Sequence, residues 1–128
     1  MKRFMIICLL LLAGCGGGSS SEADTPSAAR PGQEIFEERI LGPNPGCITC
    51  HSLDPETTLV GPPIAGVASR ALSRVEGQRA EEYLRLSILE PSAYVVDGFD
   101  DGKMPADWQE VLSEAEITAL VGYLLTLK

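Results

Sequence analysis

Five consecutive residues, Cys47-Ile48-Thr49-Cys50-His51, limit more than any other feature what this chain of 128 residues can fold into. Two thiols separated by two residues, with an imidazole directly after the second, form the attachment pattern for c-type haem. The spacing has a chemical reason. Thiols three positions apart on one helical turn can each add to one vinyl group of the haem, and the next residue then points its imidazole at the iron. The motif predicts one covalent haem c on Cys47 and Cys50, with His51 as the proximal iron ligand.

Three other roles exist for a cysteine pair of this spacing. A thioredoxin-like redox pair needs a preceding strand and a βαβ frame, and the surrounding sequence predicts neither. A zinc site needs four ligands, whereas only Cys47, Cys50 and His51 are available beyond the N-terminal region. A plain disulfide beside an incidental histidine is the third alternative. An exported location favours haem over all three, because haem is attached to such motifs outside the cytoplasm.

The N-terminus has the pattern of a bacterial lipoprotein signal peptide. A basic start precedes an apolar run over residues 4–12, which is too short for a membrane span of ~20 residues but right for a signal-peptide core. The run ends in Leu12-Ala13-Gly14-Cys15, which resembles the lipobox whose cysteine is acylated and becomes the mature N-terminus. We predict a signal peptide over residues 1–14 and lipidation at Cys15. An uncleaved anchor, or a plain signal peptide with an incidental cysteine, is the alternative.

A tether follows the predicted lipid anchor. Residues 15–31 are rich in glycine and serine and then in alanine and proline, without apolar periodicity, which is the composition of a flexible linker. Such a segment has a root-mean-square reach of roughly 20–25 Å. The predicted globular domain therefore covers residues 32–128. A domain of this size often needs a cofactor or another staple to complete its core.

The charge balance excludes some partners. Ten Lys and Arg residues against 18 Asp and Glu give a formal net charge of −8. Removal of the predicted signal peptide takes away two basic residues and no acidic one, which brings the charge to −10. Nucleic-acid binding and attachment of a basic patch to anionic lipid both need the opposite sign, so we expect neither.

The apolar residues of the domain follow a helical period, and no convincing strand is present. In the first helical stretch Ile35, Phe36 and Ile40 share one face. Helices are expected over residues 33–41, 67–75 and 80–90, and from the capping box Ser113–Glu116 into the C-terminal segment. The pattern predicts an all-α fold of three to five short helices packed around a covalently attached haem.

Met104 is the expected sixth ligand of the iron. Met1 and Met5 leave with the signal peptide, and His51 is the only histidine. A lone methionine commonly fills a core. Met104 instead ends a polar loop, residues 97–103, directly before a proline, which suits a strap over a haem face. Ligation by histidine and methionine leaves no open position on the iron and favours the ferrous state.

The order of these features resembles that of the class I c-type cytochromes, over residues 32–128. Gly32 and Phe36 stand where the first helix of that family places a glycine and an aromatic residue against the last helix. Tyr123 stands where the last helix supplies the facing aromatic side chain. The resemblance implies the cytochrome c fold and transfer of single electrons through an exposed haem edge.

The resemblance also implies further contacts to the cofactor. Residues 61–66, GPPIAG, match the Gly-Pro loop of the family, whose proline carbonyl, here that of Pro62, accepts a hydrogen bond from the proximal histidine. Arg70 stands where the family often has an arginine near the inner haem propionate, with an exposed surface arginine as the alternative. Trp108 either packs in the core or bonds a propionate through its indole. Residues 87–105 resemble haem domains associated with cytochrome c oxidase subunit II.

Together these features predict a membrane-tethered monohaem electron carrier, not an enzyme. We expect a lipid-anchored monomer on the extracytoplasmic side of a bacterial membrane, serving respiratory or photosynthetic complexes. A terminal oxidase and a quinol-oxidising complex are the expected kinds of redox partner. One alternative is a haem-based sensor of a small ligand, in which Met104 leaves the iron. The other is an electron-transfer subunit of a dehydrogenase or reductase. The long linker favours a roaming carrier, and binding of carbon monoxide would favour the sensor.

Overall fold

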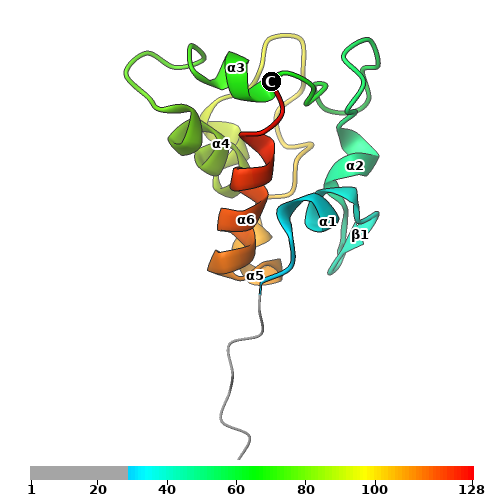
Figure 1. Cartoon of the computed structure of the whole chain (residues 1–128). Coiled ribbons are helices and arrows are strands. Elements are labelled where there is room, and N and C mark those ends of the chain that lie inside the picture. Colours follow the sequence, from blue (N-terminus) through cyan, green and yellow to red (C-terminus); the bar gives the residue numbers. More distant parts are fainter. Residues whose placement is uncertain (1–28) are drawn as a thin grey trace, which may run out of the picture.

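The computed structural model describes residues 29–128. Over this range the chain forms six α-helices, a 3-10 helix and a small hairpin (Figure 1). In chain order these are α1 (Gly32–Glu37), β1 (Ile40–Leu41), β2 (Asn44–Pro45), α2 (Cys47–Cys50), α3 (Val67–Ala71), α4 (Ala80–Leu89), η1 (Pro91–Ala93), α5 (Trp108–Val111) and α6 (Glu114–Leu124). No helix within these hundred positions has the length and apolar character needed to cross a membrane. The predicted signal peptide, Cys15 and the linker up to residue 28 lie outside the described residues.

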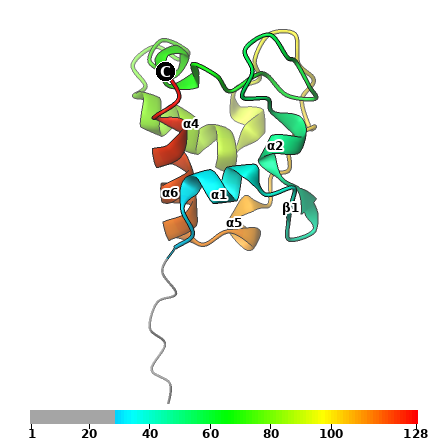
Figure 2. The ribbon, with the colours of Figure 1, turned by 45° about the vertical axis from the view of Figure 1, so that its right-hand side comes forward.

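Helices α1 and α6, from opposite ends of the domain, cross and pack against each other (Figure 2). A Cβ atom built on Gly32 would lie 2.0 Å from the carbonyl oxygen of Ala119, so only glycine permits this approach. The rings of Phe36 and Tyr123 pack beside it with their centroids 5.7 Å apart. This crossing joins the two chain ends into one core.

The first helix is shorter than the sequence indicates. The expectation of a helix over residues 33–41 is wrong beyond Glu37, because the chain then becomes extended and forms the β1–β2 hairpin. Ile40 is 69% exposed rather than inward-facing, and Leu41, at 2%, takes its place in the core. Gly42 makes the turn at a φ of +60°. The hairpin returns the chain to the last turn of α1 and places α2 beside it.

The two longest helices agree with the expected periodicity. Helix α4 covers nearly all of the predicted stretch and buries Ala80, Tyr83, Leu84 and Ile88. Helix α6 begins at the predicted capping box, in which the Ser113 hydroxyl accepts from the Glu116 backbone N–H and the Glu116 carboxylate accepts from the Ser113 backbone N–H. The expectation of a helix over residues 67–75 is wrong beyond Ala71, where α3 ends, and the next residue, Leu72, is 70% exposed. The predicted all-α class is confirmed. The described residues form six α-helices where three to five were expected, and the hairpin is an addition.

Candidate functional site

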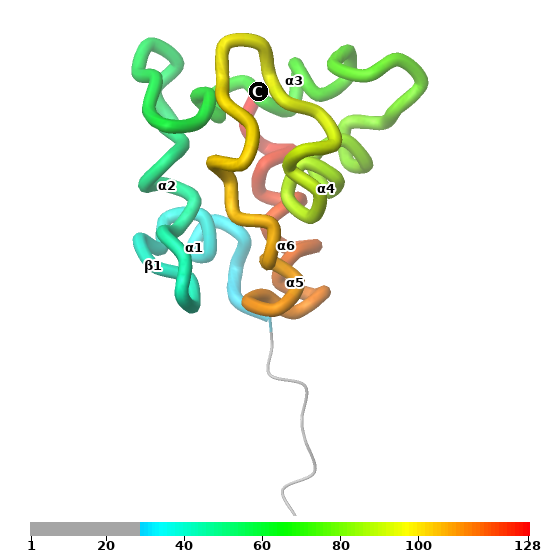
Figure 3. Tube along the Cα trace, turned by 180° about the vertical axis from the view of Figure 1, so that it is seen from behind, coloured from blue at the N-terminus to red at the C-terminus, as the bar shows by residue number. Residues whose placement is uncertain are grey.

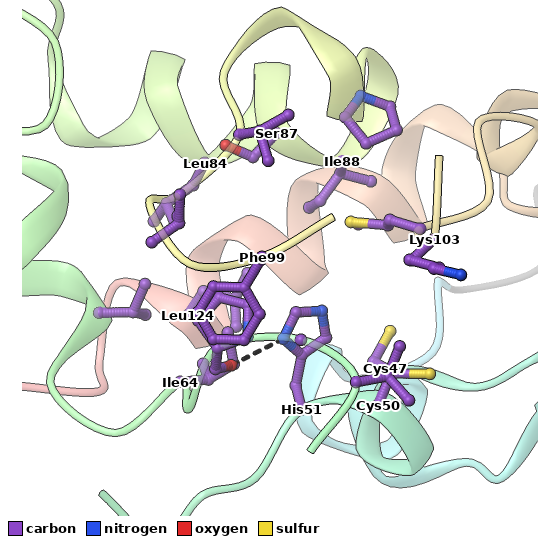
Figure 4. A pocket seen from close by; sticks show the side chains of 18 of the residues that line it. Cys47, Cys50, His51, Ile64, Leu84, Ser87, Ile88, Phe99, Lys103 and Leu124 are labelled. Atoms are coloured by element: carbon purple, nitrogen blue, oxygen red, sulfur yellow. Dashed lines mark hydrogen bonds between the residues drawn. The ribbon is translucent and has the colours of Figure 1, made fainter. Parts of the chain in front are cut away.

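One cleft gathers the site residues that the sequence predicts within the described range. It lies between α2, the loop over residues 61–66, α4 and the segment over residues 94–105. Figure 3 shows the course of these segments. In Figure 4 the side chains of Cys47, Cys50 and His51 enter from one side, and Ser87 and Ile88 of α4 lie on the other. The predicted residues that line the cleft are Cys47, Cys50, His51, Pro62, Arg70, Met104 and Trp108.

The two cysteines lie on a single helical turn, as their spacing predicts. Helix α2 is closed by a hydrogen bond from the His51 backbone N–H to the Cys47 carbonyl at 2.9 Å. No disulfide joins Cys47 and Cys50, and both side chains are half-buried at the cleft. Burial raises the pKa of the Cys47 thiol to about 11, so this thiol stays protonated at neutral pH. A thioredoxin-like pair needs a thiolate, and the cleft does not favour one.

His51 is held in one orientation and one tautomer. Its Nδ1 atom lies 2.9 Å from the Pro62 carbonyl oxygen (dashed in Figure 4). A carbonyl only accepts, so Nδ1 carries the proton and Nε2 keeps a free lone pair. Burial lowers the pKa of the imidazole, against a smaller opposing effect of the bond to Pro62, and the ring is neutral at pH 7. A Cβ atom on Gly61 would lie 2.4 Å from His51 Cε1, so glycine is required beside the ring.

Met104 lies in a loop braced on both sides. Before it, Asp101 Oδ1 accepts from the Ser92 hydroxyl at 2.6 Å and from the Gly102 backbone N–H at 2.7 Å. After it, the Asn44 side chain donates to Asp107 Oδ1 at 2.7 Å, which ties the loop to the hairpin before α2. The sequence carries no signal for the second brace, because its two partners are 63 positions apart. The braces hold the half-buried thioether at the cleft wall.

Trp108 carries a buried donor without an acceptor. The side chain is 3% exposed, and its indole Nε1 has no hydrogen-bond partner among residues 29–128. An unsatisfied buried donor is costly, so the position suits a carboxylate that enters the cleft with a ligand. A haem propionate is such a group.

Arg70 is placed differently from a free surface arginine. Its Nη1 donates to the Ala65 carbonyl at 2.6 Å and its Nη2 to the Pro63 carbonyl at 2.7 Å. The sequence did not indicate this contact, which depends on how α3 folds back over the preceding loop. A role at a haem propionate stays a prediction for this residue.

The donor set of the cleft fits a haem and does not fit the rival sites. Two thiols, one neutral imidazole, one thioether and an orphaned indole N–H meet between mainly apolar walls. Within residues 29–128 no group of three or more His, Cys, Asp or Glu side chains is arranged to hold a metal ion. The zinc interpretation therefore gains no support from the described part of the chain.

Comparison with known proteins agrees with this site. The family model for cytochrome c matches residues 29–128, the whole of the described range. A search of curated proteins finds no match. Proteins of the matched family bind haem c covalently through a cysteine pair and carry electrons, and Cys47 and Cys50 hold the position of that pair. The match covers the whole described domain, and both the α1–α6 crossing and the cysteine turn at the cleft agree with it. The chain therefore belongs to the cytochrome c family.

Proposed function

We propose that this cytochrome is a one-electron carrier whose iron is held by His51 and Met104. The observation that carries the proposal is that the only imidazole and the only thioether of the predicted mature chain line the same cleft. Bound haem supplies reversible one-electron chemistry between ferric and ferrous iron. A thioether ligand favours the ferrous form and so raises the potential. With His51 and Met104 both bound to it, the iron would have no position left for a substrate.

The surrounding residues keep both ligands ready for electron exchange. The Pro62 carbonyl orients the His51 ring and leaves Nε2 free to bind. The braces at Asp101 and Asp107 limit movement of Met104. The apolar walls exclude water, and the Trp108 indole N–H is available to a propionate. A site held in one arrangement has little to reorganise when an electron enters or leaves.

We further propose that a lipid on Cys15 anchors the carrier to a bacterial membrane, with the domain on the extracytoplasmic side. The lipobox-like residues 12–15 and the linker-like composition of residues 16–31 support this. A monomer on such a tether suits exchange with large membrane complexes, such as a terminal oxidase or a quinol-oxidising complex. The resemblance of residues 87–105 to oxidase-associated haem domains favours the oxidase as electron acceptor.

The ligand set is tested by Met104→Leu, with Lys103→Ala as the neighbouring control. The oxidised wild-type and control proteins should show the far-red sulfur-to-iron charge-transfer absorption, and Met104→Leu should lose it. The midpoint potential of Met104→Leu should fall, because the thioether no longer stabilises ferrous iron. Carbon monoxide should bind the ferrous variant and not the ferrous wild type.

Carbon monoxide binding and electron-exchange assays discriminate between the candidate functions. Binding of carbon monoxide by the wild type at neutral pH would support a sensor in place of a carrier. Rapid oxidation of the reduced protein by isolated membranes that contain a terminal oxidase would support the roaming carrier. Reduction only by one purified dehydrogenase, or oxidation only by one purified reductase, would support the dedicated subunit.

A further inference from the structure

We propose that Arg70 is a positioning residue for the proximal ligand. Its guanidinium holds two carbonyl groups of the 61–66 loop, so that the neighbouring Pro62 carbonyl stays in place to accept the hydrogen bond from His51 Nδ1. The inference rests on the proposed function, in which His51 binds the iron.

The contact has the form of a fork that spans the loop. Arg70 reaches back from α3, half-buried, and its two terminal nitrogens bond carbonyls that are two residues apart, at Pro63 and Ala65. Hydrogen bonds from a charged donor are stronger than neutral ones. The planar guanidinium offers two donors in a fixed relative direction, which an ammonium group does not. The loop is therefore held at two points by one rigid group.

The backbone of the loop has few other means to fix itself. The peptide unit that carries the Pro62 carbonyl has no N–H, because the next residue is Pro63. Its only hydrogen bond in the described structure is the one from His51. The orientation of that unit therefore depends on the units beside it.

The next peptide unit is the one that Arg70 fixes. Its carbonyl, that of Pro63, accepts from Arg70 at 2.7 Å. Its N–H, that of Ile64, donates to the Ser52 carbonyl at 2.7 Å. On the other side, the Gly61 N–H donates to the Cys50 carbonyl at 2.8 Å. The unit that faces His51 lies between these anchors, and Arg70 supplies the only one made by a side chain.

The consequence for the iron follows from the His51–Pro62 hydrogen bond. A hydrogen bond from the distant ring nitrogen makes a histidine ligand more basic. A more basic ligand stabilises ferric iron and lowers the midpoint potential. Weakening the hold of Arg70 should therefore raise the potential. Loss of a positive charge near the haem acts the other way, because a nearby cation disfavours the ferric state. Loss of the positioning role and loss of the charge of Arg70 therefore shift the midpoint potential in opposite directions.

The substitution Arg70→Lys separates them, because it keeps the charge and removes the fork. Arg74→Lys is the matched control, since Arg74 also lines the cleft and makes no hydrogen bond to the 61–66 loop in the described structure. Arg70→Ala removes both charge and fork. All three holoproteins are compared with wild type by potentiometry and by proton NMR of the reduced, ¹⁵N-labelled state.

We expect Arg70→Lys to raise the midpoint potential. Exchange of the His51 Nδ1 proton and of the Gly61 and Ile64 amide protons should become faster by roughly tenfold or more, because the loop opens more readily. In Arg74→Lys these protons should exchange as in wild type. In Arg70→Ala exchange should be at least as fast as in Arg70→Lys.

An Arg70→Lys protein with wild-type potential and wild-type exchange at these protons would overturn the proposal. So would a potential that falls in Arg70→Ala and stays constant in Arg70→Lys, which is the result of a charge effect alone. If Arg70→Ala does not retain haem, Arg70→Lys decides the matter by itself. Failure of the proposed function looks different: the His51 ring protons of the reduced wild type would then lack the large upfield shift that the haem ring current gives an iron-bound imidazole.

Discussion

At the scale of single residues, the buried indole of Trp108 has two possible roles, as a packing group in the core or as a hydrogen-bond donor to the cofactor. A side chain that only packs gains nothing from an N–H group without an acceptor, and its burial there is a cost. An N–H that meets a haem propionate repays that cost with a charge-assisted hydrogen bond. The two cases differ in whether the holoprotein loses a hydrogen bond when the indole N–H is removed.

We therefore expect Trp108→Phe to destabilise the holoprotein. The ring stays buried and the donor is lost, so the free energy of unfolding should fall by about 1.5–3 kcal/mol, the usual contribution of a hydrogen bond to a charged group. Denaturant unfolding of the haem-containing protein measures it. Unchanged or increased stability would mean that the indole has no propionate partner.

The sequence predicts the residues that line the cleft better than the groups that hold them there. The cysteine pair and His51 follow from a fixed local spacing, and Met104 follows from elimination, because it is the only methionine of the predicted mature chain. The bonds of Asn44 to Asp107 and of Arg70 to the 61–66 loop join groups whose proximity is created by the tertiary fold. No local sequence pattern identifies such partners, since many other polar residues of the chain could form hydrogen bonds of the same kind.

At the scale of elements, the α1–α6 crossing depends on how close two backbones come. Gly32 has no space for a methyl group, because the nearest atoms belong to the backbone of α6 and cannot rotate away. Gly122, on α6 itself, is exposed and has no atom within 4 Å of a Cβ built on it. These two helical glycines should respond to the same substitution in opposite directions.

Gly32→Ala should lower the free energy of unfolding by about 1–3 kcal/mol, because the helices must separate to admit the methyl group. Gly122→Ala should raise it by roughly 0.5–1 kcal/mol, since alanine is the better helix former and meets no obstacle. Thermal and denaturant unfolding of the two holoproteins measure both. Equal stabilisation by both would show that helix propensity, not the crossing, governs position 32.

Element boundaries were predictable where a cap marks them and unpredictable where tertiary contacts end the helix. The capping box before α6 is written in the sequence and occurs in the structure. The end of α1 is not marked by any cap. There Gly46 comes so close to the residue after α1 that a Cβ would lie 1.8 Å from the Glu38 carbonyl oxygen, and this close return of the chain accompanies the extended conformation of Glu38. A helical period alone cannot report such a return.

At the scale of the whole molecule, acidification should weaken the contacts that hold the first and last helices of the domain together. Glu116 caps α6 and pairs with Arg30, which also pairs with Glu38. The hydrogen bond from the Ser113 backbone, and then Arg30, hold the pKa of Glu116 below its ordinary value. A lowered pKa in the folded state gives stability that is present above the unfolded value of 4.5 and is lost as pH falls through the folded one.

The expected result is a pH-dependent difference between wild type and Glu116→Gln. At pH 7 the variant should be less stable by roughly 0.5–1 kcal/mol, the size of a well-placed exposed ion pair. The gap should close as pH falls below the unfolded pKa, because wild type then loses the same charge. Urea unfolding at a series of pH values measures it, and a gap that stays constant into acid would contradict the assignment.

Membrane attachment is also a property of the whole molecule, and it is tested by Cys15→Ser. If the lipid on this residue is the anchor, the variant should be found among exported proteins that are free of the membrane fraction. Stable anchoring takes two acyl chains or an equivalent second signal, so little should remain bound. Fractionation with a salt wash and haem staining measures it. Retention in washed membranes would contradict lipidation as the anchor.

The ion pairs of Arg30 also bear on which end of the domain would face the proposed membrane anchor. They fix the entry of the chain to α1 and α6, at one end of the molecule, whereas the loops over residues 53–60 and 97–103 lie at the opposite end (Figures 1 and 3). If the domain is tethered as proposed, the end that carries the exposed Leu59 and Val60 would lie away from the point where the chain enters the domain. Encounters with a partner at that end would then not compete with the anchor for the same surface.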